Sequence, residues 1–162
     1  MKKLLVVGAI ALFGAVSAQT GFKLGAHVGL PVGDVSTAYG FTAGVDASYL
    51  WPVAADFNLG VASGFSSYFP KSDFKDMGAE NLNLVPIAAS GQYKFTPEFS
   101  LGVDLGYGLF FADGESDGGF YYQPKAAYHF GLNEINLSYV GVSQDGGTVS
   151  SVNIGFAHSF GK

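Results

Sequence analysis

The stretch that decides the fold is FSLGVDLGYGLFF, residues 99–111 of a chain of 162 residues. Bulky apolar side chains occupy the odd positions from 99 to 111, while Ser, Gly or Asp occupies the even positions from 100 to 108. Successive side chains of a β-strand point to opposite faces, so this alternation predicts a strand with one bulky apolar face and one small or polar face. Such a strand is typical of a transmembrane β-barrel.

The same alternation recurs along the chain. The eight alternating segments are residues 22–30, 41–51, 57–65, 85–95, 99–111, 120–130, 135–139 and 151–160. No run of roughly 18 apolar residues follows residue 20, which excludes a helical membrane span. The sequence therefore predicts an all-β fold, an eight-stranded antiparallel up-and-down transmembrane β-barrel.

The connections between these segments alternate in length. Residues 31–39, 67–81, 112–119 and 143–148 are longer or rich in Gly and Asp, whereas residues 52–56, 96–98 and 131–134 are tight. Outer-membrane barrels have short periplasmic turns and longer extracellular loops. We therefore expect the longer connections to face outward from the cell.

The first residues have the layout of a secretory signal peptide. Lys2 and Lys3 precede an apolar stretch from Leu4 to Val16, and Val16-Ser17-Ala18 provides a cleavage site of small residues. We expect residues 1–18 to be a signal peptide and residues 19–162 to be the barrel domain. This export signal and the strand pattern together predict a bacterial outer-membrane location.

Composition excludes several classes of protein. Without cysteine, the chain is neither a disulfide-stapled module nor a lipoprotein, and it has no thiolate metal site. The formal charge is −5, or −7 once Lys2 and Lys3 are removed, and there is no arginine, which argues against nucleic-acid binding. Only 13% of residues are charged, too few for an ordinary water-exposed surface.

The distribution of charge predicts which face meets lipid. No Asp, Glu or Lys falls on the apolar face of any segment, and only Asp46 and Asp104 among the acids fall within strands. A soluble lipocalin-like barrel would instead turn its apolar face inward and its charges to water. We therefore expect the apolar face to point outward and the small polar face to line the lumen.

Aromatic side chains concentrate near the segment ends, where they predict two girdles at the membrane interfaces. The predicted girdle residues are Tyr49, Trp51, Phe57, Tyr93, Phe95, Phe99, Tyr128 and Phe160 near the tight turns, and Tyr107, Phe111, Tyr122 and Tyr139 near the longer loops.

Two candidate charge pairs lie on the predicted lumen face. His27 and Asp46 lie on neighbouring segments, as do Asp104 and Lys125, and counting from each connection places the partners roughly opposite each other. Buried charges are costly unless paired, so a satisfied polar interior is the favoured interpretation, with a proton or ion path as the alternative.

Other patterns that could carry chemistry are weak. Asp113, Glu115 and Asp117 resemble the start of a calcium loop, but Pro124 stands where the closing Glu would be, so we expect neither a metal nor a cofactor. His158 and Ser159 point to opposite faces of one strand, and no G-x-S-x-G motif occurs, so we expect no enzyme activity.

Three segments carry a family resemblance. They are Leu84-Val85-Pro86-Ile87 running on to Tyr93-Lys94-Phe95, then Ile135-Asn136-Leu137-Ser138-Tyr139, and a final strand with Phe156 and Phe160. In these the chain resembles the small bacterial outer-membrane β-barrel family, in particular its PorT-like branch common in Bacteroidota. The resemblance extends over nearly all of residues 19–162, and it implies outer-membrane lipids and the barrel assembly machinery as partners.

The leading functional hypothesis is a non-enzymatic outer-membrane protein whose barrel anchors surface loops for structural or binding work. Within loop 67–81, Tyr68, Phe69, Phe74 and Met77 could contact a protein or ligand partner or pack over the barrel mouth. The alternatives are a narrow transport channel, a component of a secretion apparatus, and a soluble periplasmic lipid carrier.

Overall fold

The computed structural model describes residues 21–112 and 114–160, most of which form strands. In chain order the strands are β1 (Phe22–Val32), β2 (Tyr39–Pro52), β3 (Phe57–Pro70), β4 (Leu82–Lys94), β5 (Phe99–Ala112), β6 (Glu115–Phe130), β7 (Asn133–Gln144) and β8 (Gly147–Ser159). A 3₁₀ turn, η1 (Gly33–Thr37), follows β1, and a short helix, α2 (Ser72–Lys75), follows β3. The predicted signal peptide, residues 1–18, lies outside the described residues.

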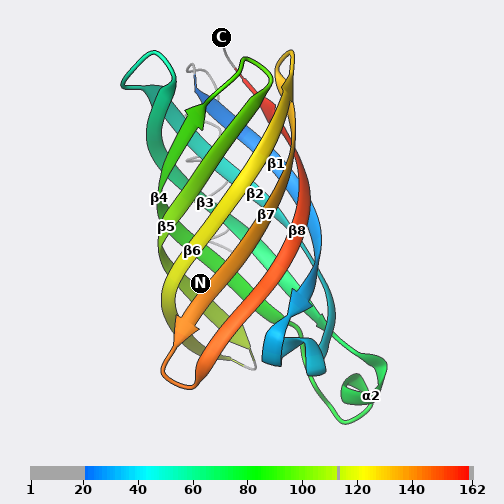
Figure 1. Cartoon of the computed structure of the whole chain (residues 1–162). Helices are drawn as coiled ribbons and strands as arrows, with labels where there is room; N and C mark the ends of the chain where they lie inside the picture. The colour runs from blue at the N-terminus through cyan, green and yellow to red at the C-terminus, as the bar shows by residue number, and fades with distance from the viewer. Residues whose placement is uncertain (1–20, 113, 161–162) are drawn as a thin grey trace.

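The strands form one closed barrel. Each strand pairs antiparallel with the next along the chain, and β8 pairs with β1 to close the ring (Figure 1). The closing ladder runs from Lys23 opposite Ser159 to Val32 opposite Ser150. The predicted eight-stranded antiparallel up-and-down barrel is therefore confirmed. In the described part of the chain, no helix is long and apolar enough to cross a membrane.

The two faces of each strand differ as the alternation predicts. In β5, Leu101 and Leu105 are exposed on the outer face, whereas Ser100 and Asp104 are each only 2% exposed on the inner face. The interior of an eight-stranded barrel is so narrow that side chains fill it, which favours small and polar residues at many inward positions.

Two of the connections predicted to be long are tight. β6 begins at Glu115, opposite Ala112 of β5, and only Asp145 and Gly146 separate β7 from β8. The predictions of loops over residues 112–119 and 143–148 were therefore wrong. Polar and glycine residues mislead here, because backbone pairing continues past the apolar part of a strand wherever the neighbouring strand is also extended.

The connection between β3 and β4 is shorter than residues 67–81. β3 continues to Pro70, and the connection that holds α2 spans residues 71–81. Figure 1 shows α2 projecting beyond the end of the barrel wall. We call this end, which carries the connections after β1, β3, β5 and β7, the loop end, and the opposite end, where β1 begins and β8 finishes, the turn end.

A buried apolar cluster, the apolar plug, fills the interior toward the loop end. Its members are Tyr68, Leu84, Ala88, Phe110, Tyr121, Val140 and Val142. Tyr68, Leu84, Val140 and Val142 lie just outside the alternating segments, so the sequence did not predict this cluster. Strands β3, β4, β5, β6 and β7 bring these side chains together inside the ring.

We expect Leu84→Ala to lower the free energy of unfolding by about 2–5 kcal/mol, because it opens a cavity in a well-packed cluster. Leu84 is 1% exposed, whereas Leu101 on the outer face is 56% exposed, which makes Leu101→Ala the matched control. Urea titration of the refolded protein in detergent measures both. Equal losses for the two variants would contradict the plug.

Candidate functional site

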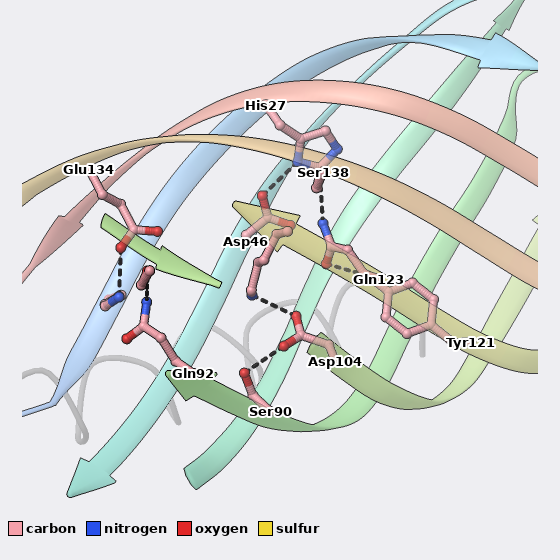
Figure 2. A network of polar contacts seen from close by, with 12 residues as sticks. His27, Asp46, Ser90, Gln92, Asp104, Tyr121, Gln123, Glu134 and Ser138 are labelled. Atoms are coloured by element: carbon pink, nitrogen blue, oxygen red, sulfur yellow. Dashed lines mark hydrogen bonds and ion pairs between the residues drawn. The ribbon is translucent and has the colours of Figure 1, made fainter. Parts of the chain in front are cut away.

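Charged and polar side chains from several strands converge inside the barrel. Figure 2 shows Asp46, Asp104 and Glu134 among them. These residues border a cavity of about 50 Å³, whose lining also includes Lys23 and Lys125. A cavity of this size holds only one or two water molecules, so most of these groups must find partners in the protein.

The structure brings His27 and Asp46 together. His27 lies opposite Gly44 in the β1–β2 ladder and Asp46 lies opposite Gly25, so the two side chains are diagonal neighbours. Nδ1 of His27 lies 2.6 Å from Oδ2 of Asp46. The other ring nitrogen, Nε2, lies 3.0 Å from Oγ of Ser66, a residue that the sequence analysis did not single out.

Asp104 and Lys125 also meet. Nζ of Lys125 donates to Oδ2 of Asp104 over 2.8 Å, and Oγ of Ser90 donates to Oδ1 over 2.5 Å. The partners are again diagonal, because Asp104 lies opposite Gln123 and Lys125 lies opposite Gly102. The Asp104 side chain is only 3% exposed, so this carboxylate depends on its protein partners.

A third charged cluster, nearer the turn end, escaped the sequence analysis. Nζ of Lys23 lies 2.6 Å and Nδ1 of His129 lies 3.4 Å from Oε2 of Glu134, and Oγ of Ser100 lies 2.7 Å from Nε2 of His129. The sequence predicts that Glu134 lies in a turn, but β7 begins at Asn133 and Glu134 points inward. The sequence did contain a signal for this cluster. The alternation in residues 22–30 places Lys23 on the lumen face, where neither candidate charge pair provides it with an acidic partner.

The prediction that only Asp46 and Asp104 among the acids lie in strands was wrong. Glu134 lies inside β7, and both Glu115 and Asp117 lie in β6. Glu115 and Asp117 are exposed near the tip of the β5–β6 hairpin, where water solvates them, so they violate no burial rule.

The calcium-loop candidates do not come together as a described site. Asp113 lies outside the described residues, and Oδ1 of Asp117 accepts a hydrogen bond from the backbone N–H of Gly118. Within residues 21–112 and 114–160, no group of three His, Cys, Asp or Glu side chains is placed to hold a metal ion.

The four loop residues named as candidate partner contacts have different positions. Tyr68 is 1% exposed inside the apolar plug, with its hydroxyl 3.2 Å from Oγ of Ser151, so it is unavailable to a partner. Phe69 stacks on Phe41 with ring centroids 4.5 Å apart. Phe74 is half-buried in α2, and Met77 is 73% exposed.

The predicted girdle aromatics lie on the outer face, where most are exposed. Toward the turn end, Tyr49 contacts Trp51, and Phe99 contacts both Phe95 and Tyr128. Toward the loop end, the Tyr122 ring stacks on Tyr139. Tyr122 also covers Gly141, whose missing side chain leaves room for the ring. The remaining predicted members, Phe57, Tyr93, Tyr107, Phe111 and Phe160, lie on the same outer face.

Comparison with known proteins finds similarity in structure. No protein-family model matches the chain, and no curated protein sequence does. The match to Ail, the attachment invasion locus protein of Yersinia pestis, covers 85% of this chain and 95% of Ail, with a TM-score of 0.55 and 17% identity. The N-terminal β-barrel domain of Pseudomonas aeruginosa OprF matches over 87% of this chain and 98% of that domain, with a TM-score of 0.55 and 15% identity.

The outer-membrane enzyme PagL matches over 84% of this chain and 98% of its own, with a TM-score of 0.59 and 15% identity. At these identities the likeness shows a common fold. The chain has the small closed β-barrel that these proteins share, while its assignment to the PorT-like branch stays a prediction.

We expect Asp104→Asn to lower the free energy of unfolding by about 3–5 kcal/mol, because it leaves the Lys125 ammonium inside the barrel without its partner. The double variant Asp104→Asn, Lys125→Met should lose much less. Asp117→Asn on the exposed hairpin is the control and should change stability by no more than about 0.5 kcal/mol. Denaturant titration measures all three, and equal losses in the single and double variants would contradict a dry pair.

Proposed function

We propose that this protein is an integral outer-membrane β-barrel with a non-enzymatic structural or binding role that its loop end performs. The observation that carries the proposal is the outer face of the barrel. On the described strands, the outward positions hold no Asp, Glu or Lys, and they expose large apolar side chains such as Leu24, Ile87, Leu101 and Ile154. Monomeric soluble proteins rarely expose so continuous an apolar surface, whereas acyl chains match it.

The interior argues against the alternatives. A narrow channel needs an open lumen, but the apolar plug and the paired charges fill this one. A lipid carrier needs an apolar cavity, but the cavity here is small and bordered by charged groups. A role in a secretion apparatus rests on family analogy alone. PagL is an enzyme with a similar fold, so the fold by itself does not decide between an enzymatic and a non-enzymatic role.

The loop end has the exposed groups for binding. Its described charged residues are Asp34, Asp73, Asp76, Glu80, Glu115, Asp117 and Asp145, against Lys71 and Lys75. Ail has been crystallised with the heparin analogue sucrose octasulfate. The acidic loop end of this protein suits a partner of opposite, positive charge better than a polyanion. We also propose that the signal peptide is cleaved after Ala18 and that the outer-membrane assembly machinery is a partner during insertion.

We expect residues 19–162 to refold only in the presence of detergent or lipid. The refolded protein should migrate faster on gels than the same protein after boiling. Trp51, the single tryptophan, should lose fluorescence to lipids brominated near the headgroup, because its exposed ring lies in the turn-end girdle. In the control Trp51→Phe, Met77→Trp, the indole moves to the exposed loop and should respond to aqueous iodide instead. A monodisperse protein in plain buffer would contradict the membrane role.

We expect a photo-crosslinker at Met77 to capture a partner in intact cells, because this side chain is 73% exposed on the connection after β3. The matched control is a photo-crosslinker at Val53, which is 50% exposed at the turn end. Products obtained only from position 77 support binding at the loop end. Identical products from both positions would contradict it.

A further inference from the structure

Three side chains on neighbouring strands form a continuous hydrogen-bond chain inside the barrel. Oγ of Ser66 lies 3.0 Å from Nε2 of His27, and Nδ1 of the same ring lies 2.6 Å from Oδ2 of Asp46. One tautomer satisfies both contacts, with Nδ1–H donating to the carboxylate and Nε2 accepting the serine hydroxyl. This is the order of groups that activates a serine nucleophile.

Gly44 makes this arrangement possible. His27 of β1 lies opposite Gly44 of β2, which lies opposite Ser66 of β3, so the three residues form one row across the sheet. A Cβ atom at position 44 would lie 2.8 Å from Cε1 and 2.9 Å from Nε2 of His27. The imidazole of His27 therefore passes over Gly44 to reach Ser66. A side chain at this position of the intervening strand, β2, would block the contact.

We propose that Ser66 is a covalent modification site, a serine activated by His27 and oriented through Asp46 that reacts with small acyl or sulfonyl electrophiles. In the reaction, Oγ of Ser66 attacks the carbonyl carbon or sulfur, and its proton passes to Nε2 of His27. The bond to the leaving group breaks, and the leaving group departs with that proton. With a sulfonyl fluoride the products are a sulfonate ester on Ser66 and hydrogen fluoride.

The surroundings of Ser66 limit the size of the reagent. Leu84, a plug residue, lies directly opposite Ser66 in the β3–β4 ladder, and Asp46 borders the cavity of about 50 Å³. Because Leu84 is buried directly opposite Ser66, we expect only small groups such as acetyl or methylsulfonyl to be accepted there. The proposal is independent of the membrane role, because a structural barrel can carry a reactive serine.

A second chain in the same barrel provides an internal comparison. Ser100 contacts His129, and His129 lies 3.4 Å from Glu134, but Lys23 holds that carboxylate more closely, at 2.6 Å. Ser100 is only 2% exposed and also accepts a hydrogen bond from Gln92, whereas Ser66 is half-buried. Both the weaker carboxylate contact and the lower exposure predict that Ser100 reacts more slowly than Ser66.

The test is to treat the full barrel, refolded in detergent micelles, with methanesulfonyl fluoride and to locate the adduct by mass spectrometry of peptides. We expect one methylsulfonyl group per chain, on Ser66, and none in Ser66→Ala. Ser90→Ala is the matched control, because Ser90 also contacts a carboxylate but no imidazole, and it should label like the parent protein.

The role of the histidine is tested with His27→Gln, which keeps hydrogen-bonding groups but has no basic nitrogen. Its labelling rate should fall on the order of 10²-fold or more. Heat-dependent gel mobility verifies that each variant is folded. No adduct on the parent protein, an adduct on Ser100 with Ser66 unmodified, or an unchanged rate in folded His27→Gln would each overturn the proposal.

Discussion

The pairing of β8 with β1 is the interaction on which the rest of the structure depends. It joins the last strand to the first over residues 23–32 and 150–159, so no strand of the ring has a free edge. In a bilayer each unpaired backbone group would cost several kcal/mol, and closure removes that cost. Closure with eight strands also fixes the width of the ring, and a ring this narrow must be filled by its own side chains.

The narrow interior explains why glycine and large side chains alternate between strands. The Lys125 side chain passes over Gly102, and Asn153 lies against Gly29, just as His27 crosses Gly44. Each glycine leaves the space that a neighbouring long side chain occupies. The most buried carboxylates, Asp104 and Glu134, are held in contact with basic side chains for the same reason, because little room is left for water around them.

The sequence predicted the fold from its period-two pattern because lipid and lumen demand opposite residue types on successive positions. The same pattern predicted that His27 would lie near Asp46 and Asp104 near Lys125, since diagonal neighbours follow from strand order. Ser66 and Glu134 escaped because each lies just past the end of an alternating segment. There the strand continues through backbone pairing with its neighbours, and backbone pairing does not require an alternation of apolar and polar residues in the sequence.

The fit between glycines and their neighbours has a consequence for how such chains diverge. Acyl chains require apolar side chains but no particular side-chain shape, so Leu, Val, Ile and Phe can replace one another on the outer wall at little energetic cost. Inside, a side chain at Gly44 would collide with His27, so change there requires two substitutions together. Ancestry among small barrels would then be recorded in compensating pairs across strands, which residue-by-residue comparison overlooks even when backbones superimpose.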